Sequence, residues 1–442
     1  MAGTAFGALG AALVLHGVPV SPGWGAVALA AGAALLTPGA AVMRALVLGT
    51  VSGGISALLG WADAAAIGVT AMAVHLALTA LRRRRPVAAP PVLTPASDSV
   101  RDAYAGRAVL VTGAGGSIGS ELARQVLDLR PARLVLLDLN EYALYRIEAA
   151  LRPAADAAGI PIVAVLGSAG DARLLDRLLP AQGVEVVLHA AAYKHVPLVE
   201  ANPAVALENN VLATETLLRA SGRAGVARFV LISTDKAVRP AGVMGQTKWM
   251  AEHVVRDLGS RMPDLTTAIV RFGNVLGSSG SVLPLFRAQV RAGGPVTITD
   301  RRMERYFMTV PDAVDLVLEA GAMASGGETF LFDMGAPVRV EALARQVIAE
   351  AGLEVRGRWG LGGDIELRET GLRPGEKLRE DLAACGRLQP TDHPRIRIAP
   401  ETRLSEIEVA GLLRATRQAV EDGRGLDPAL LSRADHATAR AD

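Results

Sequence analysis

Four polar side chains follow one another at the end of an apolar run, in the stretch RFVLISTDKA. Ser233, Thr234, Asp235 and Lys236 come directly after a predicted buried strand, where packing gives no reason to place a carboxylate beside an amine. Such a pair can exchange protons with a substrate as a general acid and a general base. We therefore predict that at least two of these four residues act in catalysis.

A glycine-rich turn, VTGAGGSIGSE, lies between a predicted strand and a predicted helix. Its glycines, Gly113, Gly116 and Gly119, are three residues apart, with Ser117 and Ile118 between the last two. Glycine lets backbone N–H groups approach a pyrophosphate, which binds at the positive end of the helix dipole. In this strand–turn–helix context the spacing predicts a dinucleotide site formed by all five residues.

Asp138 ends the next predicted strand, where a carboxylate can accept hydrogen bonds from the ribose hydroxyls of a dinucleotide. No arginine follows it immediately, so the 2′-phosphate of NADP would meet unbalanced negative charge. The pattern therefore favours NAD over NADP. The alternative role for Asp138 is to cap the helix that follows.

The stretch HAAAYKHVPLVE leaves the fourth predicted strand, and its small residues allow close approach of a cofactor. We therefore assign Ala190 and Ala191 to the cofactor site. Lys194 and His195 could contact cofactor or substrate, but an ordinary loop accounts for them equally well. We include Lys194 among the candidate ligands of both.

The elements that must position these side chains alternate between short apolar runs and amphipathic stretches. Runs without polar alternation are typical of strands buried on both faces of a parallel sheet. Their recurrence with helices predicts an α/β fold, a doubly wound parallel sheet of Rossmann type. The strands are predicted within 108–113, 133–138, 161–167, 184–191, 228–233 and 266–272, and two of the helices within 117–129 and 205–225.

Residues 1–81 hold most of the apolar excess, with Arg44 and Asp63 as their only formal charges, and four arginines follow at 82–85. We predict an all-α transmembrane region at 1–85 with about four spans; three spans remain possible. The positive-inside rule places the arginines, and the domain after them, in the cytoplasm. The alternatives are an alanine-rich soluble bundle and a cleaved signal peptide. Residues 86–100 are proline-rich and predict a linker.

The overall charge is nearly balanced, with 46 basic and 44 acidic residues among 442, so no nucleic-acid partner is expected. A single cysteine, Cys385, excludes an internal disulfide and fits a reducing compartment. No histidine and cysteine spacing indicates a metal site.

The motifs TGAGGSIG, HAAAYKHVP, ENNVLAT, STDKAVRP and MGQTK resemble the extended short-chain dehydrogenase/reductase superfamily. More narrowly, VRFGNVLGSSGSVLPLF, TITDRRMERYFMTVPDAV and GLRPGEKLREDL resemble membrane-associated polysaccharide-biosynthesis (CapD-type) nucleotide-sugar 4,6-dehydratases. The resemblance covers 101–400 and implies one NAD-binding catalytic domain with a small C-terminal substrate-binding part. Residues 401–442 are predicted to form a helix and a polar tail.

The resemblance implies conversion of UDP-N-acetylglucosamine to a 4-keto-6-deoxy sugar for surface polysaccharides. Hydride passes from C4 to NAD, water is lost across C5–C6, and hydride returns to C6. In this reaction Asp235 would be the acid that aids the loss of water, and Lys236 the base at C5. A lysine acts as a base only when it is deprotonated, and a carboxylate beside it opposes deprotonation. Asp235 and Lys236 must therefore be separated in space or titrate as one unit.

Met244 stands four residues before Lys248, where ordinary members of the superfamily carry a tyrosine on the same helix face. A subset of the dehydratases resembles this chain in having methionine there. A thioether has no proton to exchange. We hypothesise that Thr234 positions the 4-hydroxyl, and that Asp235 or a water held by Lys248 receives its proton.

The resemblance also implies substrate contacts from Asn274, Arg305, Arg373 and Glu376. Guanidinium groups match the oxygens of a diphosphate, and a glutamate can accept from ribose hydroxyls. The alternatives are a surface ion pair for Arg305 and a simple turn for RPGE. Ser168 stands where many relatives have an aspartate near the adenine, which leaves adenine contacts there open.

Two other functions remain as alternatives. A UDP-N-acetylhexosamine 4-epimerase needs only reversible oxidation at C4, and Asp235 with Lys236 argues against it. A membrane regulatory protein that binds the nucleotide without turnover is opposed by the retained Lys248 and Thr234. The superfamily resemblance also leads us to expect a homo-oligomer, most simply a dimer, at the cytoplasmic membrane.

Overall fold

The computed structural model describes residues 96–278, 280–357, 362–383 and 387–426. The predicted transmembrane region at 1–85, Cys385 and the tail from 427 onward lie outside this part of the chain. Within the described residues, no helix combines the length and the apolar character that a membrane crossing requires. Helix α5 (Asp98–Tyr104) begins inside the segment predicted to be a linker.

The chain divides into two compact units. The larger comprises Pro90–Leu285, Ile298–Leu343 and Glu369–Asp442, and it contains every residue predicted for the site that the structure describes. The smaller includes Phe286–Thr297 and Ala344–Arg368, where the Gln289 side chain donates a hydrogen bond to Thr297 Oγ1 at 2.7 Å. Four elements contribute residues to both units: α13 (Val282–Arg291), β8 (Val296–Ile298), α15 (Val340–Glu350) and β13 (Leu367–Glu369).

A nine-stranded sheet forms the centre of the larger unit, with the order β14-β15-β11-β6-β5-β4-β1-β2-β3. The seven neighbouring strands from β3 to β11 are parallel. At the edge beyond β11, β15 pairs antiparallel with β11, and β14 pairs antiparallel with β15. The predicted doubly wound parallel sheet is therefore confirmed. The strands are β1 (Ala108–Thr112), β2 (Arg133–Asp138), β3 (Ile162–Leu166), β4 (Val186–His189), β5 (Arg228–Ile232), β6 (Thr266–Arg271), β11 (Glu328–Phe332), β14 (Gln389–Pro390) and β15 (Ile396–Ala399).

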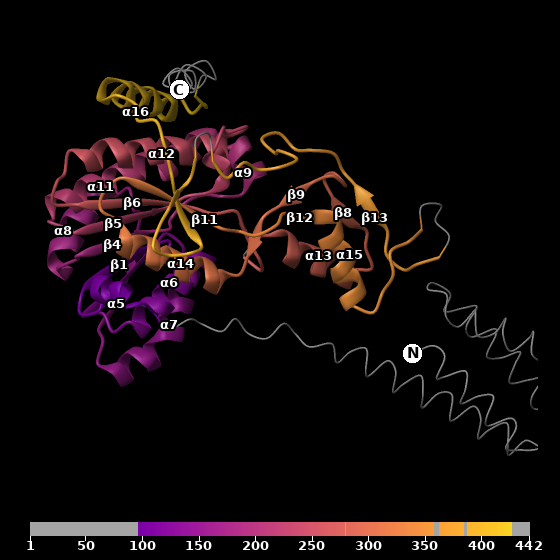
Figure 1. Ribbon diagram of the computed structural model, residues 1–442, viewed down its shortest axis with the longest axis horizontal. Coiled ribbons are helices and arrows are strands. Elements are labelled where there is room, and N and C mark those ends of the chain that lie inside the picture. Colours follow the sequence, from indigo (N-terminus) through magenta and orange to yellow (C-terminus); the bar gives the residue numbers. More distant parts are fainter. Residues whose placement is uncertain (1–95, 279, 358–361, 384–386, 427–442) are drawn as a thin grey trace, which may run out of the picture. The chain divides into compact units, whose positions relative to one another are not determined.

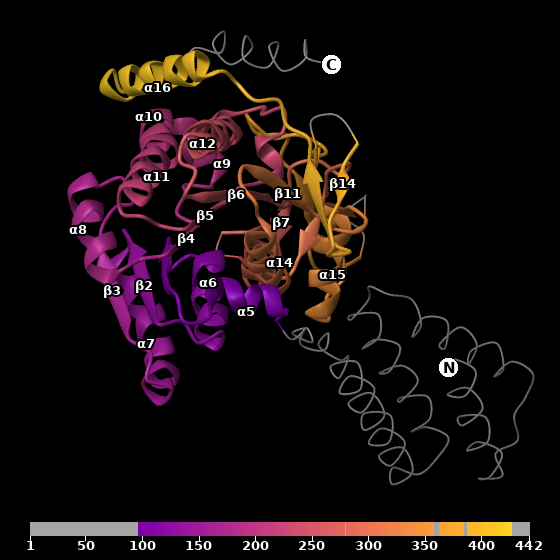
Figure 2. The same cartoon turned by 60° about the vertical axis from the view of Figure 1, so that its left-hand side comes forward.

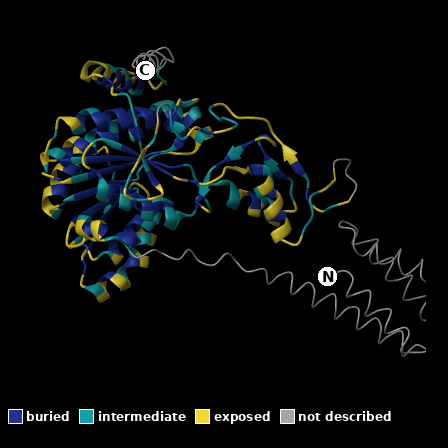
Figure 3. Cartoon of the chain, viewed as in Figure 1, coloured by how far each residue is buried: buried dark blue, intermediate teal, exposed yellow. Residues whose placement is uncertain are grey.

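Helices cover both faces of this sheet, as Figures 1 and 2 show. The core on one face includes residues of α5, α6 (Ser117–Asp128), α7 (Glu141–Ala158) and α14 (Val310–Met323). The core on the other face includes residues of α8 (Ala172–Gln182), α11 (Ala213–Arg223), α12 (Val243–Ser260) and α16 (Glu406–Glu421). Strands β1 and β4 are buried along their whole length, which explains their continuous apolar sequences (Figure 3).

The helix predicted over 205–225 is present as one helical run from Pro203 to Arg223, with a π-helical turn inside it. Short helices α9 (Val196–Ala201) and α10 (Pro203–Leu207) lead into a π-helical turn, η1 (Glu208–Leu212), before α11 begins. Such a turn adds a residue to the helix and often lies at a functional site. The remaining short elements are a 3₁₀ turn η2 (Asp235–Ala237), and the strand pairs β7 (Asn274–Val275) with β10 (Phe307–Met308) and β9 (Glu304–Arg305) with β12 (Val338–Arg339).

Candidate active site

The glycine-rich turn after β1 is packed too closely for any side chain. Gly113 has φ +63°, and a Cβ there would lie 2.7 Å from the backbone N and Cα of Ala191. A Cβ on Gly119 would lie 2.0 Å from the carbonyl oxygen of Gly113. Gly116 is the N-cap of α6, so Ser117 and Ile118 occupy the first helical positions. This turn presents a helix N-terminus beside bare backbone, which fits the pyrophosphate of a dinucleotide.

The Asp138 carboxylate supports this turn from the end of β2. Its Oδ2 accepts a hydrogen bond from Gly115 N at 2.8 Å, and its Oδ1 accepts one from Asn140 N at 2.8 Å. The side chain that caps α7 is Asn140, so the capping role considered for Asp138 is wrong. Ser168, beyond β3, accepts a hydrogen bond from Gly170 N at 3.0 Å.

The loop after β4 is held by Asn210, a residue that sequence reasoning did not assign. The Asn210 side chain accepts from Tyr193 N at 2.8 Å and donates to Tyr193 O at 3.0 Å. It also donates to Thr247 Oγ1 at 3.0 Å, which links the loop to α12. The π-helical turn η1 carries Asn210. Lys194 and His195 are exposed on the same loop.

His189, the last residue of β4, is a buried structural residue. Its Nδ1 lies 2.7 Å from Thr112 Oγ1 and its Nε2 lies 2.9 Å from Thr214 Oγ1. Burial, followed by the charge of Lys248, lowers the pKa of His189 to about 3. The imidazole is therefore neutral at pH 7, and both of its nitrogens have partners.

The polar residues after β5 diverge in direction. Ser233 donates a hydrogen bond of 2.6 Å to the buried Glu252, away from the other three. Thr234 donates to Asp235 Oδ1 at 2.9 Å, and Lys236 Nζ donates to the same oxygen at 2.9 Å. The possibility that Asp235 and Lys236 are separated in space is therefore wrong. Asp235 is fully buried, and its Oδ2 has no partner in the part of the chain that the structure describes.

Met244 and Lys248 lie one turn apart in α12, and both are buried. Met244 packs against Val199 and Ala206 in a small apolar cluster. Lys248 Nζ donates a hydrogen bond of 2.6 Å to Ile232 O, at the end of β5. Burial lowers the pKa of Lys248 to about 8, and a nearby carboxylate opposes that shift. The spacing predicted from the sequence is preserved, with a thioether in place of a phenol.

A small pocket joins Met244 to Lys236. Its volume is about 10 Å³, enough for about one water molecule. Three charged side chains absent from the predicted site also line it: Glu200, Lys377 and Glu380. The sequence signal for Glu380 was the acidic end of GLRPGEKLRED, but nothing in that pattern connected it with the residues after β5.

Glu200 fills the space between two glycines. Its Oε1 accepts a hydrogen bond of 2.7 Å from Val243 N, at the start of α12. A Cβ on Gly242 would lie 2.4 Å from that oxygen and 2.6 Å from Gly375 Cα. The RPGEK turn therefore packs directly on the N-terminus of α12, which carries Met244.

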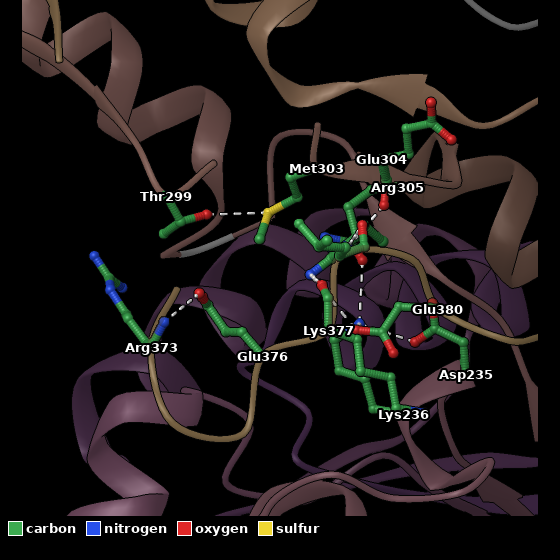
Figure 4. A network of polar contacts seen from close by, with 12 residues as sticks. Asp235, Lys236, Thr299, Met303, Glu304, Arg305, Arg373, Glu376, Lys377 and Glu380 are labelled. Atoms are coloured by element: carbon green, nitrogen blue, oxygen red, sulfur yellow. Dashed lines mark hydrogen bonds and ion pairs between the residues drawn. The ribbon is translucent and has the colours of Figure 1, made fainter. Parts of the chain in front are cut away.

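The predicted substrate residues form two groups. Asn274 and Arg305 belong to the network around Lys236. Asn274 Oδ1 accepts a hydrogen bond from Lys236 Nζ at 3.3 Å. Figure 4 shows Arg305 with Lys236 and Glu380. Arg305 is buried rather than a surface residue, so the alternative of a surface ion pair is wrong. Arg373 and Glu376 lie on the RPGE turn, where Arg373 N donates to Glu376 Oε2 at 3.1 Å and Glu376 N donates to Arg373 O at 3.1 Å. Arg373 is exposed.

Among the described residues, no group of three or more histidine, cysteine, aspartate or glutamate side chains is arranged to hold a metal ion.

Comparison with known proteins agrees with this arrangement. A family model described as "Polysaccharide biosynthesis protein" matches residues 109–401. The chain belongs to this family. It is 44% identical over 284 residues to the capsular polysaccharide biosynthesis protein CapD of Staphylococcus aureus, covering 64% of this chain and 46% of that protein. It is also 44% identical over 279 residues to the probable polysaccharide biosynthesis protein EpsC of Bacillus subtilis, covering 63% and 45%. The chain thus spans less than half the length of these curated relatives.

Solved structures show the same fold. Pen from Bacillus thuringiensis is 29% identical, with a TM-score of 0.59 over 69% of this chain and 90% of that one. DesIV from Streptomyces venezuelae, a dTDP-glucose 4,6-dehydratase solved with NAD and TYD bound, is 25% identical, with a TM-score of 0.53 over 71% and 97%. This member of the CapD/EpsC-type family therefore has the Rossmann-like sheet of extended short-chain dehydrogenases/reductases.

Proposed function

We propose that this protein is an NAD-dependent UDP-N-acetylglucosamine 4,6-dehydratase that supplies deoxysugars for surface polysaccharides. The observation that carries the proposal is the ion pair of Asp235 and Lys236, 2.9 Å apart, with one buried carboxylate oxygen left without a partner among the described residues. Elimination across C5–C6 requires a base at C5 and an acid at the 6-hydroxyl, and this pair contains one group suited to each role. The CapD relationship supports a role in polysaccharide synthesis.

The fit of the cofactor rests on the turn after β1. Gly113 and Gly119 allow close backbone packing that a Cβ would prevent, which leaves the N-terminus of α6 bare, and Asp138 holds the turn from β2. When bound there, NAD would supply the hydride acceptor for C4 and the hydride donor for C6. Because Asp138 is not followed by an arginine, we propose NAD rather than NADP.

The proton transfers can be assigned to this chain's own residues. Asp235 takes the proton of the 4-hydroxyl and later gives it to the departing 6-hydroxyl, which leaves as water. Lys236 takes the proton from C5, exchanges it with solvent, and gives a solvent-derived proton back to C5 when C6 is reduced. Each residue ends the cycle in the protonation state in which it began, and the net change is the loss of one water. Thr234, 2.9 Å from Asp235, positions the 4-hydroxyl.

Met244 takes no proton in this scheme, and the proposal places the chain in the methionine subset of the dehydratases. Lys248, one turn after Met244, would bind the cofactor. The uridine diphosphate would be bound by Lys194, Asn274, Arg305, Arg373 and Glu376. Arg373 is exposed and available for a diphosphate, whereas Arg305 would act from within the network.

We also propose where the protein is located in the cell and how its chains assemble. The apolar residues 1–85 support a multi-pass anchor in the cytoplasmic membrane, with the catalytic domain in the cytoplasm. We propose a homo-oligomer, most simply a dimer, on the resemblance to the superfamily.

A 4-epimerase is the second candidate. A UDP-glucose 4-epimerase of Rickettsia felis is 31% identical over 297 residues, covering 65% of this chain and 81% of that protein. The site argues for the dehydratase because a 4-epimerase has no need of a base at C5, whereas Lys236 lies in the pocket beside Met244.

The deciding experiment is NMR of UDP-N-acetylglucosamine incubated in D₂O with the purified full-length chain and catalytic NAD. A 6-deoxy-4-keto product carrying deuterium at C5 would establish the dehydratase, and its coupling constants would show whether C5 is inverted. A C4 epimer that retains its 6-hydroxyl would establish the epimerase instead. Binding without any turnover would favour the regulatory function.

A further inference from the structure

Glu380 is a buried carboxylate that faces the proposed base. Its side chain is 3% exposed, and its Oε1 lies 3.6 Å from Lys236 Nζ and 3.6 Å from Arg305 Nη2. Its Oε2 is buried and has no partner among the described residues. Figure 4 shows Glu380 and Asp235 close to Lys236. A carboxylate taken out of water and left with a bare oxygen is unfavourable unless nearby cations compensate.

The segment that carries Glu380 is tied to the site at two points. The Arg305 guanidinium donates hydrogen bonds to the main-chain oxygens of Lys377 at 2.7 Å and Leu378 at 3.1 Å. The Lys377 ammonium donates to Val238 O at 2.9 Å, just after η2. The carboxylate of Glu380 is therefore placed beside Lys236 by fixed backbone, and not by the flexibility of a surface loop.

Lys236 faces two carboxylates and one amide. Asp235 Oδ1 lies 2.9 Å from its Nζ, Asn274 Oδ1 lies 3.3 Å away, and Glu380 Oε1 lies 3.6 Å away. The other charged groups that line the adjoining pocket are Glu200 and Lys377. Glu380 is thus shared between two cations, Lys236 and Arg305.

We propose that Glu380 is a positioning residue for Lys236: its charge, beside Lys236 and Arg305, holds Nζ between Asp235 and Asn274. This inference rests on the proposed function, because it assigns Lys236 the proton transfer at C5. It deepens that function by giving the RPGEKLRE segment a part in catalysis in addition to nucleotide binding.

The test compares Glu380→Gln with the wild type in two measurements. The first is the pH profile of C5 deuterium incorporation. Removing the Glu380 charge destabilises the ammonium, so the acidic limb should move to lower pH by about one unit. Loss of positioning should lower the plateau rate by about 10-fold, less than removal of the base itself would. A purely structural role would lower the plateau and the melting temperature and leave the limb in place.

The second measurement does not need turnover. Lys236 is labelled by reductive methylation at a series of pH values, and the modified peptide is quantified by mass spectrometry. In Glu380→Gln, the pH at which labelling of Lys236 rises should also be lower by about one unit. Unchanged limbs would overturn the proposal. Asp381→Asn, the same chemical change at the next and exposed position, should move neither limb.

The two measurements separate failure of this proposal from failure of the proposed function. If the wild type shows no C5 exchange but the labelling limb moves, the dehydratase assignment is wrong and Glu380 still governs the Lys236 amine. If C5 exchange occurs and neither limb moves, only the role of Glu380 is wrong. If Glu380→Gln does not fold, Glu380→Asp is the second variant, because it moves the charge away from Lys236 by one methylene. The pH at which Lys236 labelling rises should then shift by a smaller amount in the same direction. No shift would overturn the proposal.

Discussion

Asp235 Oδ1 and Lys236 Nζ lie 2.9 Å apart, so these chain neighbours form one ion pair at the end of β5. The contact constrains the proposed chemistry. Lys236 can accept a proton from C5 only after the pair has lost one, and Asp235 can donate to the 6-hydroxyl only after it has gained one. The proton of the 4-hydroxyl is the one available to Asp235, which connects oxidation at C4 with elimination at C5–C6.

Asp235→Asn should therefore abolish C4 oxidation as well as dehydration. The amide is nearly the same size but cannot accept the proton of the 4-hydroxyl. General base catalysis contributes about 10²- to 10⁴-fold, so the rate should fall by at least about 100-fold. The measurement is NADH absorbance in a single turnover with the NAD-loaded enzyme, alongside a binding assay for the nucleotide sugar. Normal accumulation of NADH in this variant would show that another group takes the proton.

Met244→Leu should retain at least about half of the wild-type turnover. Met244 packs against Val199 and Ala206, and leucine conserves its volume in that cluster. The thioether has no proton to exchange, so its loss should not change the chemistry. Steady-state turnover and the melting temperature test this. A loss of about 100-fold with unchanged stability would mean that the sulfur itself contacts the reacting groups.

The sheet could be predicted because its signals are local. In a parallel sheet covered on both faces, each strand must be apolar throughout, and each strand end must turn at a small or polar residue. β2 spans Arg133–Asp138, as the run RLVLLD predicts. Ser233 and Thr234 face opposite sides because successive side chains alternate along an extended chain. That alternation was a usable signal, and applying it would have removed Ser233 from the catalytic group.

The remainder of the site depends on tertiary contacts that sequence patterns do not contain. Asn210 lies in the π-helical turn, and its amide binds the backbone of Tyr193, 17 positions earlier in the chain. Glu380 meets Lys236 only because Arg305 holds the backbone between them. The contact of Asp235 with Lys236 depends on side-chain rotamers, so the sequence left both arrangements open.

Gly113→Ala should lose NAD binding, whereas Gly106→Ala should retain it. Both glycines have positive φ, +63° and +66°, so alanine suffers a similar backbone strain of about 1 kcal/mol at each. Only Gly113 is crowded: a Cβ would lie 2.7 Å from Ala191 N, whereas nothing lies within 4 Å at Gly106. Calorimetric titration with NAD measures the difference. Equal loss in the two variants would mean that strain, and not close packing of the cofactor turn, accounts for it.

Glu252→Gln should destabilise the fold by about 3–5 kcal/mol at pH 7, because it leaves two buried guanidinium groups with one carboxylate, Glu401, between them. The Glu252 carboxylate accepts from Arg271 Nε at 2.8 Å and from Arg256 Nη2 at 3.1 Å, behind β5 and β6. Burial raises the pKa of Glu252, but the two arginines and Ser233 outweigh it and lower the pKa to about 2. Chemical unfolding at a series of pH values measures the change in free energy.

The sign of the pH dependence follows from that lowered pKa. The ordinary value is 4.5, so the stabilisation from Glu252 is complete above that pH and is lost as the pH falls toward about 2. His189 adds to the same trend, since its pKa near 3 lies below the usual 6.5 and the unfolded chain binds the proton first. The wild type should therefore lose stability more steeply than Glu252→Gln between about pH 4.5 and 2. Parallel curves for the two proteins across that range would show that the ion cluster does not contribute.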